Sequence, residues 1–247
     1  KRLIVLSPSL GTLWEDTLEG DHEGFAVMHH DQMAILSGSI FGPLVGYSLR
    51  EKEVSWSVPA MPNPPFRYFT GLSASQQGFI VSFEAGFIRN YTAAGSVVAT
   101  ITTELSLIPE EVLLHGSSLI VDVRSRFGPE RYLKIYDYPS GSMRHTISPG
   151  LADAILLDAG DKIFWMGNMN GSGEVKILDP GTGDNHLLFR FEGEAIRTAT
   201  LRDDDNLFVA TPSGIFWLRP GQSSKVLFSA ALRPEFMAFD RINDFVL

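Results

Sequence analysis

Acidic, histidine and arginine side chains that could carry chemistry recur along the whole chain, close to the ends of short apolar runs. Oxygen ligands from Asp and Glu suit a hard cation such as Ca²⁺. His29 and His30 are adjacent, and neighbouring residues of an extended strand point to opposite faces, so the two do not readily bind one metal. The candidates for a polar site are His29, His30, Glu110, Glu111, Asp153, Asp158, Arg197, Arg202, Asp203, Glu235 and Asp240.

No recognised catalytic motif accompanies these side chains. The sequence contains neither the Gly-x-Ser-x-Gly turn of serine hydrolases nor the glycine-rich Lys-Ser/Thr loop that binds phosphates. The run from Asp203 to Asp205 lacks the alternating ligand positions of a calcium loop. Cysteine is absent, which excludes disulfides and thiolate zinc sites. We therefore name no catalytic residue.

The overall charge excludes two classes of partner. The 247 residues carry a formal net charge of −9 and show no basic stripe, which argues against nucleic acid and anionic membranes. No apolar run approaches the roughly 20 residues of a transmembrane helix. Lys1 in place of an initiator Met predicts a processed or trimmed chain without its targeting segment. We leave the oligomeric state and the compartment open, with export to the periplasm or extracellular space as one alternative.

The elements that would position these side chains are short strands. Between residues 197 and 228, four apolar runs are separated by turns rich in Asp, Asn, Gly and Pro, which predicts a four-stranded antiparallel meander. Runs equivalent to its second strand begin at residues 33, 79, 119, 163, 207 and 245. This is a period of roughly 40 to 45 residues, typical of the blades of a β-propeller.

The two ends of the chain complement each other. The last repeat stops after its second strand, whereas residues 1–15 have the pattern of a third and a fourth strand. We therefore predict an all-β, single-domain, six-bladed β-propeller of four-stranded antiparallel blades, closed by a blade that the two termini share. An open β-sandwich or an incomplete fragment is the alternative. The predicted blades span residues 24–58, 67–101, 110–147, 153–191, 197–228, and 236–247 together with 1–15.

Two third-strand segments, residues 134–141 and 176–183, share an apolar strand, an Asp, a turn, and Ser-Gly or Thr-Gly. They resemble the β-propeller repeat class that includes quinoprotein-like, NHL-like and gluconolactonase-like rings. In this turn Asp179 and Thr182 are expected to bind their own backbone. Gluconolactonase-like six-bladed enzymes hold a divalent metal in the central tunnel, so the resemblance implies a Ca-dependent lactonase-like or esterase-like hydrolase as an alternative function. Apart from that Ca²⁺, no cofactor is predicted.

Large apolar residues and arginines gather in the loops that join strand two to strand three and strand four to the next blade. Both sets of loops lie on one face of a propeller, and aromatic residues, Met and Arg are enriched at protein interfaces. The favoured function is therefore a non-catalytic binding or scaffold propeller for a protein or peptide partner. In the alternative interpretation, each apolar side chain only plugs the end of its own blade. The predicted binding face comprises Phe41, Met61, Phe66, Arg124, Arg126, Phe127 and Met169.

Overall fold

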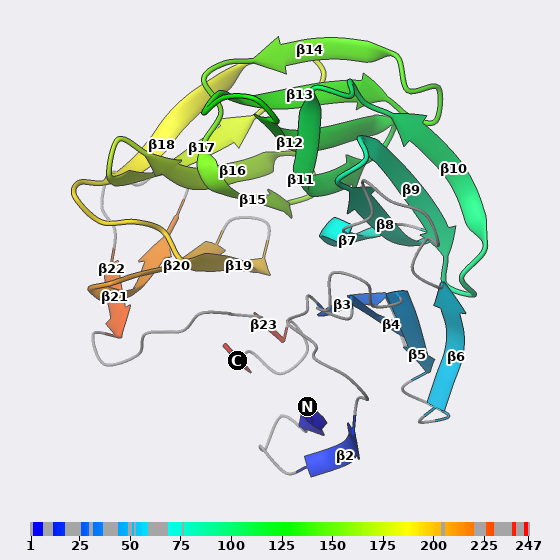
Figure 1. Ribbon diagram of the computed structural model, residues 1–247. Coiled ribbons are helices and arrows are strands. Elements are labelled where there is room, and N and C mark those ends of the chain that lie inside the picture. Colours follow the sequence, from blue (N-terminus) through cyan, green and yellow to red (C-terminus); the bar gives the residue numbers. More distant parts are fainter. Residues whose placement is uncertain are drawn as a thin grey trace. The chain divides into compact units, whose positions relative to one another are not determined.

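The computed structural model is built from β-strands, and no helix occurs among its described residues (Figure 1). The structure describes residues 2–6, 12–17, 26–29, 32–36, 44–48, 51, 53–58, 69–75, 77–203, 206–219, 226–229, 239–240 and 245–246. The chain divides into two compact units, Lys1–Thr146 and Ile147–Leu247. Each unit is described below by itself.

The first unit contains three four-stranded antiparallel sheets and one hairpin, each with its strands in chain order. The hairpin joins β1 (Arg2–Leu6) and β2 (Thr12–Thr17). The first sheet comprises β3 (Ala26–His29), β4 (Gln32–Leu36), β5 (Leu44–Ser48) and β6 (Glu53–Val58). The second comprises β7 (Phe69–Ser75), β8 (Gly78–Phe83), β9 (Phe87–Thr92) and β10 (Val97–Thr102). The third comprises β11 (Leu107–His115), β12 (Ser118–Ser125), β13 (Arg131–Asp137) and β14 (Met143–Ile147).

The second unit repeats the same design with two four-stranded sheets and a short hairpin. One sheet comprises β15 (Ala152–Asp158), β16 (Ile163–Met169), β17 (Ser172–Leu178) and β18 (Asn185–Phe191). The other comprises β19 (Thr198–Asp203), β20 (Asn206–Thr211), β21 (Gly214–Leu218) and β22 (Val226–Ser229). The hairpin joins β23 (Phe239–Asp240) and β24 (Phe245–Val246).

The five four-stranded sheets confirm the all-β class and the predicted four-strand repeat. The predicted turn chemistry is also confirmed, because Asp179 Oδ1 accepts a hydrogen bond from the Gly181 N–H (2.7 Å) and Thr182 Oγ1 accepts one from the Asp184 N–H (3.1 Å). The predicted sixth blade is not confirmed: within the described residues, β1–β2 and β23–β24 form separate two-stranded sheets.

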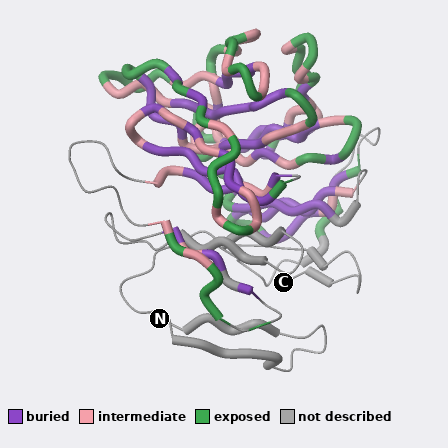
Figure 2. Tube along the Cα trace, turned by 90° about the vertical axis from the view of Figure 1, so that its right-hand side faces the viewer, coloured by how far each residue is buried: buried purple, intermediate pink, exposed green. Residues whose placement is uncertain are grey.

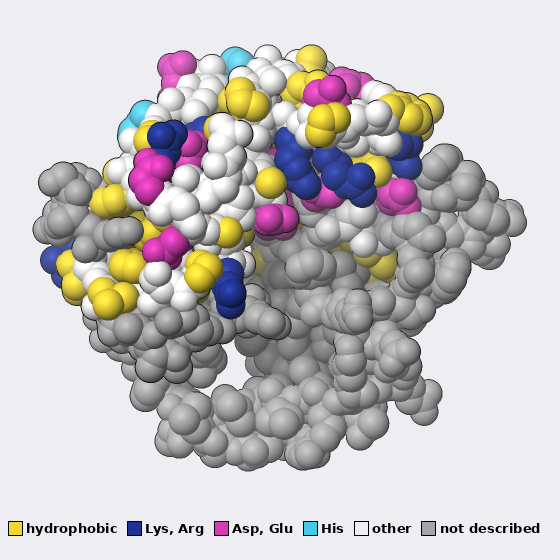
Figure 3. Space-filling view, turned by 60° about the vertical axis from the view of Figure 1, so that its left-hand side comes forward, with side chains coloured by type: hydrophobic (Ala, Val, Ile, Leu, Met, Phe, Trp, Pro, Cys, Tyr) yellow, Lys and Arg dark blue, Asp and Glu magenta, His cyan; other side chains and the backbone are white. Residues whose placement is uncertain are grey.

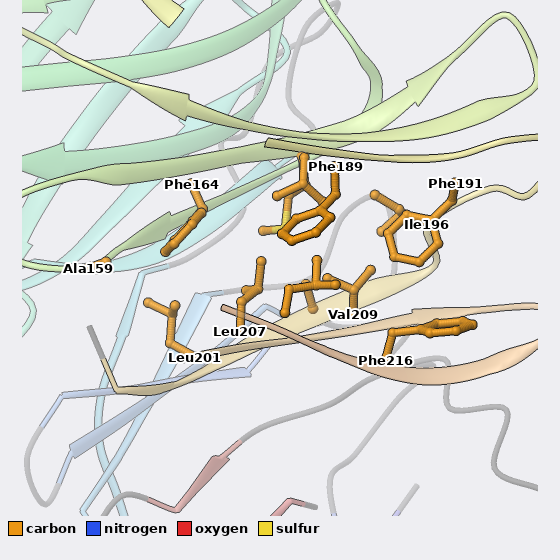
Figure 4. Packing of buried hydrophobic residues seen from close by; sticks show 13 residues of the cluster. Ala159, Phe164, Phe189, Phe191, Ile196, Leu201, Leu207, Val209 and Phe216 are labelled. Atoms are coloured by element: carbon orange, nitrogen blue, oxygen red, sulfur yellow. The ribbon is translucent and has the colours of Figure 1, made fainter. Parts of the chain in front are cut away.

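The second strands β8, β12, β16 and β20 are buried on both faces over most of their length. Figure 2 shows such buried segments in purple. Successive residues of β20 point to opposite faces, so Leu207 and Val209 join one hydrophobic cluster while Phe208 and Ala210 join another. In the first of these clusters the β15–β18 and β19–β22 sheets pack face to face, with Phe164 among its members (Figure 4). Burial on both faces explains why the second strands are continuous apolar runs rather than alternating ones.

Within each unit, the first strands of successive sheets are neighbours. In the first unit β7 lies next to both β3 and β11, and in the second unit β19 lies next to both β15 and β23. The fourth strands instead present exposed apolar side chains, such as Val97 on β10 and Leu187 on β18. This order, with first strands adjacent and fourth strands at the outer edge, is the arrangement expected for blades of a propeller.

Polar contacts also connect neighbouring sheets of the first unit. Asn90, buried on β9, accepts a hydrogen bond from Ser75 Oγ (3.0 Å) and donates one to the hydroxyl of Tyr138 in the turn after β13 of the third sheet (2.7 Å). Trp56 of the first sheet donates from Nε1 to the Ala93 carbonyl in the β9–β10 turn of the second sheet (2.7 Å). Its ring lies over Gly95, which has a φ of 80°, and a Cβ there would approach the ring to 2.7 Å.

Replacing Asn90 by Ala should destabilise the protein by about 1–3 kcal/mol, because the substitution leaves the buried Ser75 hydroxyl and the partly buried Tyr138 hydroxyl without this partner. Chemical denaturation of the whole chain measures the loss. Thr100→Ala on the exposed side of β10 is the control and should change the free energy of unfolding by less than about 0.5 kcal/mol. Equal stability of the two variants would show that Asn90 does not join the sheets energetically.

Candidate functional site

A polar pair recurs at one end of the sheets, between the start of the first strand, or the loop that precedes it, and the end of the second strand. In the first unit Thr70 Oγ1 donates to Ser82 Oγ (3.1 Å), and Arg124 Nε donates to Glu110 Oε1. The second unit has its own pairs. Asn168 Nδ2 donates to Asp153 Oδ2 (3.2 Å), and Thr211 Oγ1 donates to Glu194 Oε2 (2.5 Å). The second-strand members recur at the repeat period of roughly 40 to 45 residues.

Irregular pairing of the first strands releases several of these side chains from the core. The β11–β12 register shifts between Pro109 and Glu111, which makes Glu110 an extra, bulged residue. Val112 and Leu114 belong to the hydrophobic cluster of this sheet, and uninterrupted alternation would turn Glu110 towards the same face. The bulge directs its carboxylate to two arginines instead. Similar shifts occur beside Thr70 on β7 and Asp153 on β15.

The Glu110 carboxylate is the centre of an ion-pair network in the first unit. Arg124 contacts Oε1, and Arg131 Nη1 donates to Oε2 (2.6 Å). Arg131 and Arg124 stand opposite each other in the β12–β13 register. The same Nη1 of Arg131 lies 3.6 Å from Oδ2 of Asp122, a fully buried residue of β12. Arg131 thus connects a buried carboxylate to the partly exposed Glu110–Arg124 pair.

Glu111 lies directly opposite Asp122 in the β11–β12 register. Burial raises the pKa of the Glu111 carboxyl to about 8, and the negative charge of Asp122 adds to the effect. Glu111 is therefore mostly protonated at neutral pH. Although carboxylates gather here, no group of three or more His, Asp or Glu in the described part of the chain is arranged to hold a metal ion.

Three turns of the first unit meet beside this network. The turn at residues 83–86 is joined to residues 103–106 by a hydrogen bond from the Thr103 N–H to the Gly86 carbonyl (2.6 Å). The β12–β13 hairpin joins the same group, because the Arg126 N–H donates to the Ser106 carbonyl (2.8 Å). We call residues 83–86, 103–106 and 124–131 the loop end of the first unit. The predicted proximity of these loops is confirmed by these contacts.

Arg126 clamps this loop end through its side chain. Its Nη1 donates to Glu84 Oε1 (3.1 Å), its Nη2 to the Glu84 carbonyl (2.5 Å) and its Nε to the Leu105 carbonyl (3.3 Å). The hairpin is closed further by the Ser125 N–H, which donates to the Glu130 carbonyl (2.7 Å), and by the Phe127 N–H, which donates to Ser125 Oγ (3.2 Å). The backbone that carries Phe127 is therefore fixed from both sides.

The loop end contains two kinds of apolar side chain. Phe83 is only 2% exposed and stacks on Phe87 with ring centroids 4.3 Å apart, so these rings plug the end of their own sheet. Phe127 is 84% exposed and Leu105 is 76% exposed, the two highest values among the large hydrophobic residues whose burial is described. Phe127 therefore does not plug its sheet, unlike Phe83. Figure 3 shows Lys and Arg side chains gathered beside Asp, Glu and hydrophobic side chains on one face.

The structure brings together three residues of the predicted binding face: Arg124, Arg126 and Phe127, all in the β12–β13 hairpin. Met169 is the last residue of β16 in the second unit. Phe41, Met61 and Phe66 lie outside the described residues. Among the predicted polar candidates, Glu110 and Glu111 lie on β11, Asp153 and Asp158 on β15, and Arg202 and Asp203 on β19, while Arg197 precedes β19. His29 ends β3 and Asp240 ends β23, whereas His30 and Glu235 lie outside the described residues.

No local pattern in the sequence marks Arg131, Asp122 and Glu84 as partners of this site. Arg131 begins β13 and Glu84 follows β8, and their ion pairs join strands or sheets that are distant along the chain. The available signal is the recurrence of polar residues at the ends of four second strands, namely Ser82, Arg124, Asn168 and Thr211.

The raised pKa of Glu111 predicts a pH dependence of stability. Between the ordinary pKa of 4.5 and about 8, folded Glu111 holds a proton that the unfolded chain releases, so its contribution favours folding below pH 4.5 and declines as pH rises to about 8. In Glu111→Gln, which cannot ionise, the free energy of unfolding should fall less steeply with pH, by up to about 1.4 kcal/mol per pH unit. Chemical denaturation of both proteins from pH 5 to 9 measures the two free energies of unfolding. If the difference between them did not change with pH, the prediction would be contradicted.

Within the described residues, no helix has the length and apolar character that crossing a membrane requires. No protein-family profile and no curated protein sequence matches the chain. Among solved structures it is similar to BamB from Moraxella catarrhalis, with a TM-score of 0.60 and 17% identity over 96% of this chain and 72% of BamB. It is also similar to the computationally designed Ika8 protein, with a TM-score of 0.62 and 12% identity over 87% of this chain, and it spans 64% of that protein. At these identities the likeness concerns the fold. Together with the repeated four-stranded antiparallel sheets, it supports a place for the chain in the general β-propeller repeat class.

Proposed function

We propose that this protein is a non-catalytic β-propeller that binds a protein or peptide partner through the loop end of the first unit. The observation that carries the proposal is the 84% exposed ring of Phe127 on a hairpin that Arg126 clamps to two neighbouring turns. An exposed aromatic side chain on a fixed backbone has the properties of an interface anchor.

The fixed backbone matters because association costs conformational entropy. A mobile loop must lose its freedom on binding, whereas a loop already held in one conformation loses little. The contacts of Arg126 and Ser125 order the Phe127 backbone in the free protein. The ring has few rotatable bonds and a large apolar area, so its burial by a partner gives much free energy for little additional ordering.

The surroundings of Phe127 have the composition of a protein interface. Leu105 supplies a second exposed apolar side chain, and Arg124 supplies a partly exposed guanidinium. Exposed apolar side chains beside arginine are typical of interfaces between proteins. The proposal extends to Phe41, Met61, Phe66 and Met169, which the sequence assigns to loops of the same two kinds in other repeats.

We also propose that the scaffold is a single-domain, six-bladed ring. Its sixth blade would combine β23 and β24 as first and second strands with β1 and β2 as third and fourth. Two observations support this proposal: β19 has β23 as a neighbour, and the β20 side chains Phe208 and Ala210 are buried on the face opposite the cluster with β15–β18. Pairing of the two hairpins would also remove two free sheet edges.

A circular permutant tests the ring. If β24 pairs with β1, Leu247 and Lys1 flank a hairpin turn, and a short Gly-Ser linker can join them. The chain is then opened between the exposed residues Gly181 and Thr182. This permutant should fold and melt within a few degrees of the wild type. Deletion of residues 1–17 should lower the melting temperature markedly, because it removes half of the shared blade. A stable deletion variant together with an unfolded permutant would exclude the closed ring.

Phe127→Ala tests the binding surface. Peptides are first selected from a displayed random library on the immobilised full chain. Their affinity for Phe127→Ala should be about 30-fold or more below that for the wild type, which is the effect of removing a hot-spot residue. Fluorescence anisotropy measures the dissociation constants. The high exposure of Phe127 predicts a stability change below about 0.5 kcal/mol. The matched control is Val97→Ala, an exposed apolar residue on β10 in the same unit, and it should not alter affinity. Equal affinities for wild type and Phe127→Ala would refute the assignment.

A further inference from the structure

We infer that the loop end of the first unit recognises an acidic peptide segment. In this complex Arg124 binds a carboxylate of the peptide, and an apolar side chain of the peptide next to that carboxylate packs beside Phe127. The inference rests on the proposed function and deepens it, because it names the chemical class of the partner. It is carried by the different ways in which the three arginines of the β12–β13 hairpin use their hydrogen-bond donors.

Two of these arginines are committed to the fold. Arg126 engages Nε, Nη1 and Nη2 with Glu84 and the Leu105 carbonyl, and its side chain is only 16% exposed. Arg131 places Nη1 between Glu110 and Asp122. Removal of the Arg126 guanidinium would take this donor from Glu84 and the Leu105 carbonyl, and removal of the Arg131 guanidinium would leave Glu110 with Arg124. These two residues are therefore positioning residues, which hold the hairpin and the Glu110 carboxylate in place.

Arg124 is arranged differently. Its side chain is 43% exposed, and within the described part of the chain its contact is made through Nε, with Glu110. This contact fixes the guanidinium by one edge and leaves the two terminal amino groups available. A guanidinium donates parallel hydrogen bonds to both oxygens of a carboxylate, a geometry that a Lys ammonium cannot reproduce.

The charges around Arg124 favour an added carboxylate. Glu110 shares its single negative charge between Arg124 and Arg131, so the positive charge of Arg124 is only partly compensated. Glu111, which would add a further negative charge on β11, is mostly protonated at neutral pH because its pKa is raised to about 8. A carboxylate that approaches the exposed side of Arg124 thus meets a cation already held in position.

The same charges disfavour a phosphate group. Glu84 pairs with Arg126, Asp122 also faces Arg131, and the hairpin carries the further carboxylate of Glu130, so a dianion would meet no cluster of uncompensated cations. Phosphate recognition generally uses clusters of cations. A singly charged Asp or Glu side chain requires only the exposed edge of one guanidinium. The expected partner is therefore a peptide in which an Asp or Glu stands next to an aromatic or aliphatic residue.

An array of synthetic peptides tests this assignment directly. Each peptide carries one Phe or Leu flanked by Glu, by Gln or by phosphoserine, and the labelled full chain is applied at two salt concentrations. The wild type should bind the Glu peptides about tenfold more tightly than the Gln peptides, since charged hydrogen bonds are stronger than neutral ones. The preference should shrink at high salt because the site is partly exposed.

Two arginine variants locate the recognition. Arg124→Gln leaves Glu110 paired with Arg131, so the fold should be retained, and the Glu-over-Gln preference should disappear while Phe127 still contributes to binding. The matched control is Arg190→Gln in the second unit. Arg190 is 46% exposed and pairs with a glutamate, Glu174, and its loss should leave the preference unchanged. Melting curves confirm that both variants are folded.

The outcomes separate this inference from the function on which it rests. If Phe127→Ala leaves all peptide affinities unchanged, or if no peptide binds, the proposed function fails and the inference fails with it. If binding depends on Phe127 but Glu and Gln peptides bind equally, or if Arg124→Gln keeps the preference, only the carboxylate assignment is overturned. Stronger binding of the phosphoserine peptides would replace the acidic peptide with a phosphopeptide.

Discussion

Burial of both faces of the sheets is the constraint on which the rest of the structure depends. A sheet with two apolar faces is not stable alone, and each fully buried Val, Leu, Ile or Phe gains about 1.5–3 kcal/mol only when a neighbour covers it. Leu207 and Val209 are covered on one face of β20, and Phe208 and Ala210 are buried on the other. A chain of such sheets must stack in sequence, and the hydrogen bond from Asn90 to Tyr138 between sheets is compatible with one stacking register.

This stacking decides where function can be placed. When both faces of a sheet are buried, solvent reaches the outer strand and the turns at its two ends. The outer strands β10 and β18 carry scattered exposed side chains such as Val97 and Leu187, without a clamp like that of Arg126. The turns of the first unit are instead joined to each other across sheets, so they form one surface with a fixed backbone. A repeat scaffold thus gains a binding surface from loops that would be mobile if each were isolated.

The sequence predicted the features that local chemistry encodes. The Asp179 turn is fixed by residues within a few positions of one another, and its hydrogen bonds are those expected. The repeat length and the second strands follow from continuous apolar runs. The bulge at Glu110 was not predictable in this way, because regular alternation would turn Glu110 towards the face of Val112. Its arginine partners depend on that bulge, and the clamp from Arg126 to Glu84 joins two different sheets. Such contacts carry no local signal.

Arg124 and Arg126 show why residue type alone could not separate binding from structure. They are two positions apart on one hairpin, and the sequence assigned both to the partner face. Arg126 donates to three acceptors of neighbouring turns, so its guanidinium stabilises the fold. Arg124 meets one carboxylate, whose charge it shares with Arg131, and retains an exposed edge. The number of acceptors that tertiary packing brings to a guanidinium therefore decides whether an arginine stabilises a loop or remains available to a ligand.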